Sequence, residues 1–255
     1  MTSGPAADWA SWLARFDAQA EVYVPARERR FDVMIEVLEA LVPAGATVLD
    51  IGCGPGSLAS RVGTRLPEAT VLALDADPVL LGLGRRAVGD LGGRLRWVLA
   101  DLLVGDWRTS LGVDRVDAVV SGAALHWFPP EDLVRVLRDV AGLLAPGGVF
   151  LNGDVLPLPL RLPSVVAALD DLEDRREESA RAAGAEDWEQ WWQAVRDAGV
   201  LAAEFAERDR SELVTRRQRQ VAGAAFHEAA LRELGFREVT PVWQDLEEFV
   251  VLAVR

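Results

Sequence analysis

Residues 48–56 read Val48-Leu49-Asp50-Ile51-Gly52-Cys53-Gly54-Pro55-Gly56, and this stretch decides the fold. Apolar and β-branched residues lead into Asp50, glycines follow at alternate positions, and Ser57 opens a helical pattern. This order predicts a buried strand, a tight glycine loop and a helix. Glycine permits the sharp turn and leaves no Cβ in the way of a ligand. The helix start would then direct free N–H groups at whatever lies over the loop.

Downstream, apolar strand-like runs alternate with helical patterns. Strands are predicted at 71–74, 95–99, 116–121 and 149–152, and helices at 58–66, 78–91 and 130–144. Such alternation gives right-handed crossovers and a parallel sheet with helices on both faces. Two last apolar runs, 236–243 and 249–254, are too close for a crossover, so we expect them to pair as a hairpin.

The Asp-x-Gly-x-Gly-x-Gly spacing that starts at Asp50 resembles motif I of class I S-adenosylmethionine-dependent methyltransferases. Dinucleotide-binding enzymes usually carry G-x-G-x-x-G instead. Residues 16–27, with Phe-Asp-x-x-Ala-x-x-Tyr-x-x-x-Arg spacing, resemble the N-terminal segment of many small-molecule methyltransferases. Leu-x-Pro-Gly-Gly at 144–148 is another feature of that family. The chain is similar to the ubiquinone- and menaquinone-biosynthesis and trans-aconitate methyltransferase group.

This resemblance implies an α/β fold with a Rossmann-like seven-stranded sheet, its last strand antiparallel, and helices on both faces. The dinucleotide-binding fold generally lacks that antiparallel strand. We expect an N-terminal helical lid at 1–42, a cofactor-binding core at 43–154, a helical cap inserted after the fifth strand at 155–219, and a helix and hairpin completing the sheet at 220–255. Residues 1–7 are expected to be disordered, and cap helices are predicted at 164–183 and 187–198.

The resemblance also implies S-adenosylmethionine as the cofactor. Asp75 ends the second strand about where an α/β cofactor site has its ribose-binding acid. In the family, the acid after the third strand, here Asp101, accepts from the adenine amino group, and the next backbone N–H, here that of Leu102, meets a ring nitrogen. The expected cofactor residues are Tyr23, Arg27, Asp50, Gly52, Cys53, Gly54, Asp75, Ala76, Asp101, Leu102, Ser121 and Gly122.

Two of these residues lie in the N-terminal segment. Arg27 can hold the methionyl carboxylate through a planar two-point contact. Tyr23 is expected to shield the sulfonium. For both residues, a solvated helix start is the alternative interpretation.

The implied reaction is methyl transfer to an oxygen, nitrogen or carbon nucleophile of a small molecule. It requires positioning and exclusion of water, and no nucleophile of the protein's own. His126, after the fourth strand, is the candidate general base for an oxygen acceptor. A structural role for His126 is the alternative. His227 is a weaker candidate for the general base.

Aromatic residues of the lid and cap supply most of the expected acceptor site. The candidates are Trp12, Phe16, His126, Trp127, Trp188, Trp191 and Trp192. The three cap tryptophans share one helix face, where helix packing is the plainer interpretation. If they line a pocket, they favour a flat or apolar acceptor.

Composition disfavours several other kinds of partner. The formal net charge is −13 with no basic tract, which argues against nucleic acid. No apolar run reaches the length of a membrane span, no signal pattern is present, and the single cysteine, Cys53, suits a reducing cytoplasm. With two histidines and one cysteine, the usual zinc sites cannot be assembled, so no metal is expected.

Two alternative functions stay open at this point. One is an NAD(P)-dependent oxidoreductase on a Rossmann fold, against which the glycine spacing and the terminal hairpin argue. The other is a non-catalytic protein that keeps the S-adenosylmethionine pocket as a binding module. Turnover separates this second alternative from an enzyme.

Overall fold

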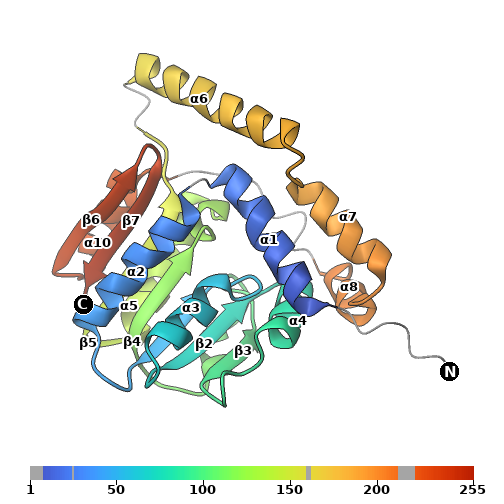
Figure 1. Cartoon of the computed structure of the whole chain (residues 1–255). Helices are drawn as coiled ribbons and strands as arrows, with labels where there is room; N and C mark the ends of the chain where they lie inside the picture. Colours follow the sequence, from blue (N-terminus) through green and yellow to red (C-terminus); the bar gives the residue numbers. More distant parts are fainter. Residues whose placement is uncertain (1–7, 25, 159–161, 212–221) are drawn as a thin grey trace.

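The structure is a computed structural model that describes residues 8–24, 26–158, 162–211 and 222–255 (Figure 1). Residues 1–7, which are expected to be disordered, therefore lie outside the described residues, as does part of the predicted cap. No helix of the described chain is long and apolar enough to cross a membrane.

One seven-stranded sheet forms the centre of the molecule, with strand order β3-β2-β1-β4-β5-β7-β6. Its strands are β1 Thr47–Ile51, β2 Thr70–Asp75, β3 Leu95–Leu99, β4 Val116–Gly122, β5 Leu144–Val155, β6 Glu238–Asp245 and β7 Glu248–Val254. Strand β1 pairs in parallel with β2 and β4, whereas β7 lies antiparallel between β5 and β6. The predicted Rossmann-like sheet with an antiparallel last strand is confirmed.

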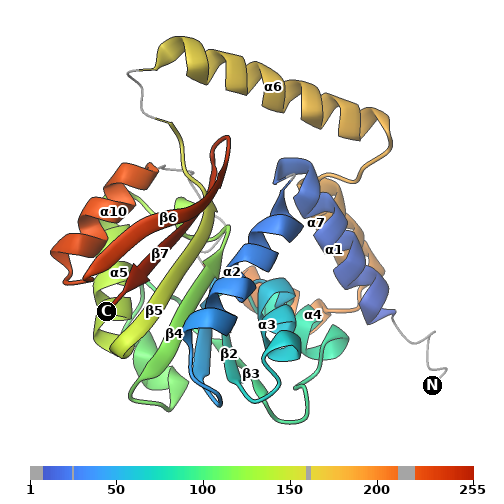
Figure 2. The same ribbon diagram turned by 60° about the vertical axis from the view of Figure 1, so that its left-hand side comes forward.

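Helices cover both faces of this sheet (Figures 1 and 2). They are α1 Trp9–Tyr23, α2 Arg27–Leu41, α3 Ser57–Arg65, α4 Pro78–Ala87, α5 Pro130–Leu143, α6 Pro163–Ala182, α7 Trp188–Ala198, α8 Ala202–Arg208 and α10 Ala224–Glu233, with short 3-10 turns η1 Trp107–Leu111 and η2 Leu125–Trp127. Alternation along β1 separates two cores, because Val48 packs with α2 and α3 while Leu49 packs with α5 and α10.

A third hydrophobic cluster joins α1 and α4 to α7 and α8. Figure 2 shows α1 and α7 side by side next to the β2–β3 end of the sheet. By contrast, α6 lies on the outside of the molecule in both views, and none of its residues is buried. Both predicted cap helices are therefore present. Helix α7 contributes buried residues to the third cluster, whereas α6 contributes none. The division of the chain into lid, core and cap stays a prediction.

Three local predictions differ from the structure. Helix α4 ends at Ala87 rather than near Leu91, because Gly89 and Leu91 adopt positive φ in a turn. The hairpin turn is tighter than the predicted loop, since β6 extends to Asp245 and β7 begins at Glu248. Helix α8 was not predicted. It is stabilised by tertiary contacts, including an ion pair from Arg208 to the start of α4.

Candidate cofactor and acceptor site

The glycine loop between β1 and α3 has the backbone that its sequence predicts. Gly52, Gly54 and Gly56 have φ of +68°, +56° and +84°, a region that side-chain-bearing residues rarely adopt. A Cβ on Gly52 would lie 2.4 Å from Cβ of Ala124, so packing also demands glycine there. At Gly54 the nearest atom to such a Cβ would be 3.8 Å away, on Phe16, and the residue lines a cavity.

Asp75, at the end of β2, is held against this loop by backbone donors. The Gly54 N–H donates to one carboxylate oxygen at 2.7 Å, and the Asp77 N–H donates to the other at 2.8 Å. A carboxylate offers about four lone-pair positions, so it can accept from several donors at once. Asp75 lines the cavity, which suits the expected contact with ribose hydroxyls.

Asp50 is a buried acid at the end of β1. Neither of its carboxylate oxygens accepts a hydrogen bond of normal geometry from the described residues. Burial, followed by the nearby charge of Asp75, raises the pKa of Asp50 well above its usual value, and the Ala59 amide opposes this only in part. Because buried polar groups are normally satisfied, this orphaned carboxylate fits a site that receives a polar or cationic group from a ligand.

These groups surround one cavity of about 1100 Å³ at the carboxyl edge of the sheet. The predicted site residues that line it are Phe16, Arg27, Asp50, Gly52, Cys53, Gly54, Asp75, Ala76, Asp101, Leu102, Gly122, His126, Trp127 and Trp188. Its volume exceeds that of a typical pocket for one drug-sized ligand. There is room for a nucleoside cofactor beside a second small molecule.

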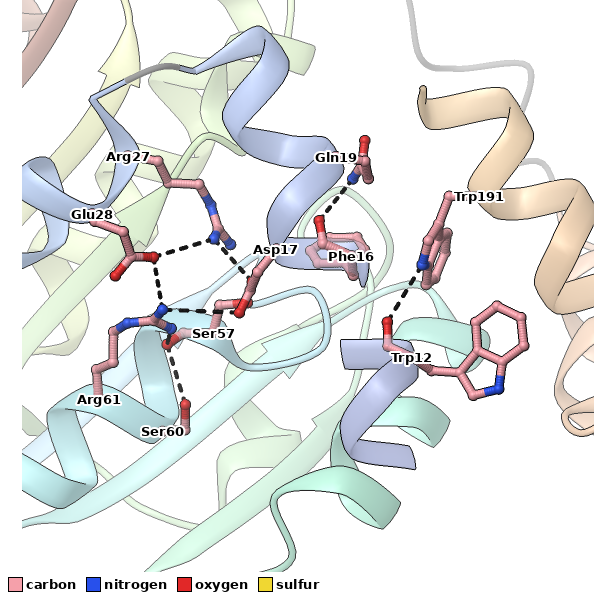
Figure 3. A network of polar contacts seen from close by, with 10 residues as sticks. All are labelled: Trp12, Phe16, Asp17, Gln19, Arg27, Glu28, Ser57, Ser60, Arg61 and Trp191. Atoms are coloured by element: carbon pink, nitrogen blue, oxygen red, sulfur yellow. Dashed lines mark hydrogen bonds and ion pairs between the residues drawn. The ribbon is translucent and has the colours of Figure 1, made fainter. Parts of the chain in front are cut away.

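Arg27 lines the cavity but already has a partner. Its guanidinium donates to Asp17 of α1 at 2.9 Å and is almost fully buried. Asp17 also accepts the hydroxyl of Ser57 at the start of α3, and Arg61 approaches the same group (Figure 3). The network therefore joins α1, α2 and α3 beside the glycine loop, and a methionyl carboxylate would share Arg27 with Asp17.

Asp101 follows β3 and lines the cavity beside Leu102. One of its carboxylate oxygens accepts the Leu103 N–H at 2.8 Å, which fixes the turn after the strand. This placement suits the expected contact with the adenine amino group. Cys53 also lines the cavity, where burial raises the pKa of its thiol well above the usual value.

Several expected site residues are not brought to the cavity. Ser121 is buried, and its hydroxyl donates to the Ile51 carbonyl in the neighbouring strand. The side chain of Tyr23 lies outside the described residues. None of Trp12, Trp191 and Trp192 lines the cavity.

The cap tryptophans serve mainly in packing. Trp191 is fully buried, its ring centroid is 5.1 Å from that of Phe16, and its indole N–H donates to the Trp12 carbonyl (Figure 3). The Trp192 ring lies under the guanidinium of Arg208 at 4.0 Å. Only Trp188 of these three lines the cavity, because a shared helix face does not determine what lies opposite each member.

Asp154 is a functional candidate that the sequence analysis missed. It lies near the end of β5, is fully buried, and has one carboxylate oxygen 2.6 Å from Nδ1 of His126. The signal was present, since acids at the ends of the other parallel strands were recognised for the same reason.

Comparison with known proteins identifies the class of this site. A family model described as a methyltransferase domain matches residues 48–148. An uncharacterized methyltransferase of Mycobacterium tuberculosis is 41% identical over 116 residues, which are 45% of this chain and 53% of that protein. A trans-aconitate 2-methyltransferase of Methylobacterium radiotolerans is 34% identical over 136 residues, covering 52% of this chain and 48% of that protein. The chain spans about half the length of the curated relatives it matches.

Solved structures show the same fold. Magnesium protoporphyrin IX methyltransferase from Synechocystis with bound S-adenosylhomocysteine has a TM-score of 0.59 at 15% identity, covering 96% of this chain and 95% of that one. The apo S-adenosylmethionine-dependent methyltransferase SibL has a TM-score of 0.58 at 21% identity, covering 88% of this chain and 54% of that one. Residues 48–148 thus match the methyltransferase domain family, and the chain has the fold of S-adenosylmethionine-dependent methyltransferases. S-adenosylmethionine is the cofactor of that class.

Proposed function

We propose that this chain binds S-adenosylmethionine in the cavity and transfers its methyl group to a small-molecule acceptor. The observation that carries the proposal is the convergence of Asp50, Asp75 and Asp101, which lie at the carboxyl ends of three adjacent strands, on one cavity beside the glycine loop. Parallel strands that end at a common edge place ligands there.

The cofactor half of the cavity matches the chemistry of an adenosyl amino acid. The Asp75 and Asp101 carboxylates both line the cavity, and a carboxylate can accept from ribose hydroxyls or from an exocyclic amine. Asp50 offers an unsatisfied carboxylate to the methionyl amino group. Gly52 and Gly54 let the ligand approach the backbone without a Cβ between them.

When bound, S-adenosylmethionine supplies a methyl group that is already activated on a sulfonium. The protein's part is then to orient the acceptor in line and to exclude water. We assign the acceptor to the part of the cavity lined by Trp127, Phe128 and Trp188, whose flat faces suit an aromatic or apolar body. We place this activity in the cytoplasm, in keeping with the single cysteine.

Calorimetric titration with S-adenosylhomocysteine tests the cofactor site. Gly54→Val should abolish binding because its side chain would enter the cavity. Gly89→Val is the matched control, since Gly89 also has positive φ, +76°, but nothing lies within 4 Å of its Cβ position. Equal loss of affinity in both variants would assign the effect to backbone strain and contradict the proposal.

Two further measurements separate the alternatives. A thermal-shift comparison should show stabilisation by S-adenosylmethionine and none by NAD. Incubation with a pool of small-molecule acceptors should release S-adenosylhomocysteine. Binding without turnover would instead favour the non-catalytic binding module.

A further inference from the structure

His126 is fixed at the cavity by a single buried carboxylate. Asp154 has one oxygen 2.6 Å from Nδ1 of the His126 ring and accepts the His126 backbone N–H with the other at 3.1 Å. The Asp154 side chain is fully buried, whereas the His126 side chain is 12% exposed and lines the cavity. Ring and backbone are thus held by the same group.

The surroundings keep Asp154 ionised. Burial acts to raise the pKa of Asp154, but its interaction with His126, the Arg30 charge and the hydrogen bond from the Val155 amide outweigh burial and hold that pKa below its usual value. Arg30, from α2, is itself fully buried and pairs with Glu248 of β7 at 3.3 Å. His227 of α10 also interacts with the Asp154 charge.

An ionised carboxylate at Nδ1 selects one form of the imidazole. The proton is retained on Nδ1, where it donates to Asp154, so the lone pair of the neutral ring lies on Nε2. No hydrogen bond to Nε2 is found among the described residues. This arrangement is that of an oriented general base, in which a third group fixes the tautomer.

We propose that Asp154 positions His126 as a general base, and that the acceptor is therefore a neutral hydroxyl compound, an alcohol or phenol, rather than a carboxylate. This inference rests on the proposed methyl transfer. A carboxylate is already ionised near neutral pH and needs no base. A hydroxyl group gains reactivity when its proton is removed as the new bond forms.

The step balances with groups already named. The acceptor O–H gives its proton to Nε2 of His126, and the acceptor oxygen forms a bond to the methyl carbon. The carbon–sulfur bond breaks, its electron pair returns to sulfur, and S-adenosylhomocysteine is the second product. The proton on the imidazolium then passes to solvent.

The charges of the acceptor half support the same class of acceptor. Asp132, Asp187 and Glu189 line the cavity, and the lining arginines among the described residues are Arg27 and Arg181. Both are already paired, Arg181 with Glu177 at 3.0 Å and Arg27 with Asp17 at 2.9 Å. A polycarboxylate would meet carboxylates here and would have to displace existing ion pairs.

The first test measures the tautomer directly by ¹⁵N NMR of ring-labelled histidine, with the His227→Gln variant used to assign the His126 signals. We expect the neutral His126 ring to carry its proton on Nδ1 in the wild-type protein with S-adenosylhomocysteine bound. Asp154→Asn should shift the ring towards the Nε2–H form. A wild-type ring protonated on Nε2 would overturn the proposal.

The second test identifies the chemical class of the product, whichever compound the acceptor is. The full chain is incubated with methyl-labelled S-adenosylmethionine and the low-molecular-weight fraction of a bacterial extract, and the products are treated with mild alkali. A methyl ester releases labelled methanol in alkali. A methyl ether keeps its label in alkali and releases it as methyl iodide on brief heating in hydriodic acid, which C-methyl products do not, and N-methyl products only under harsher heating. Release of the label as methanol would overturn the inference while leaving methyl transfer intact. Absence of any labelled product, despite cofactor binding, would contradict the methyl-transfer proposal itself.

Two variants distinguish the role of His126 as the base from that of Asp154 as the residue that positions it. His126→Gln should lower the rate of label transfer roughly 100-fold or more. Asp154→Asn should lower the rate at least about tenfold through the wrong tautomer. S-adenosylhomocysteine affinity should stay within about twofold in both, because neither residue acts on cofactor binding. Arg65→Ala, which removes only an exposed ion pair with Glu39, should retain the wild-type rate, and a loss equal to that of His126→Gln would count against the assignment.

Discussion

The backbone amide of Gly54 donates to the carboxylate of Asp75, with nitrogen and oxygen 2.7 Å apart. This contact ties the glycine loop after β1 to the end of β2, the next strand in the sheet. The conformation of the loop and the orientation of the expected ribose-binding acid are therefore coupled by this hydrogen bond.

Asp75→Asn should weaken both binding and stability. The asparagine must turn its amide nitrogen towards either the Gly54 or the Asp77 N–H, which leaves a donor facing a donor. We expect S-adenosylhomocysteine affinity to fall at least about tenfold and the free energy of unfolding to fall by about 1–3 kcal/mol. Calorimetry and urea unfolding measure the two effects. Unchanged affinity would remove Asp75 from the cofactor site.

Asp50→Asn should stabilise the protein without cofactor. Because the pKa of Asp50 is raised in the folded state, the unfolded chain binds fewer protons at this group as pH rises above the usual aspartate value. The wild-type protein then loses stability from that pH up to the folded-state pKa, and the asparagine variant should lack this loss. Urea unfolding between about pH 4 and 8 measures the difference. An identical pH dependence of the free energy of unfolding in both proteins would contradict this prediction.

Asp154→Asn should show the opposite pH dependence. The pKa of Asp154 is lowered in the folded state, so its charge stabilises the fold above the usual aspartate pKa. That contribution disappears as pH falls through the folded-state value. The wild-type protein should therefore lose more stability than the variant on acidification below about pH 4, as followed by thermal melting.

Trp191→Ala and Trp188→Ala should separate packing from function. Trp191 is fully buried, so its removal should cost about 3–5 kcal/mol of unfolding free energy. Trp188 lines the cavity, and its removal should raise KM for the acceptor with a smaller loss of stability. Equal stability losses in both variants would mean that Trp188 is also a core residue.

Arg208→Ala should weaken the packing of α8 against α4. Arg208 pairs with the buried Asp77 at 2.7 Å, and Asp77 also accepts the Val79 N–H at the start of α4. Removal of one partner from such a pair costs about 3–5 kcal/mol. Arg65→Ala is the control, because its exposed pair with Glu39 should contribute at most about 1 kcal/mol. Chemical unfolding of both variants measures the contrast.

The fold was predictable because its signals are local. Strand and helix patterns, the glycine loop and the short hairpin connection each occupy a few consecutive residues. The acids at the strand ends were predictable for a related reason, since parallel strands bring their carboxyl ends to one edge. Asp154, near the end of β5, follows the same rule as Asp75 and was therefore equally predictable.

Contacts between distant segments were not predictable. The pairing of Arg27 with Asp17 depends on how α1 turns into α2, and no periodicity reveals it. Helix α8 has only 7 residues, too few to be stable alone, and depends on Arg208 reaching Asp77. The face shared by Trp188 and Trp191 was correctly recognised, but the neighbours of that face come from α1.

The position of β7 has a consequence for folding kinetics. Asp154 of β5 lies opposite Phe249 of β7, so it is shielded from water only after the hairpin has inserted beside β5. Strand β6 reaches the sheet only through β7, and the sheet therefore cannot grow in the order in which its strands are synthesised. Such non-local pairing is slow and leaves β5 as an open edge in any partly folded chain. Formation of the His126–Asp154 pair should accordingly report the last cooperative step of refolding.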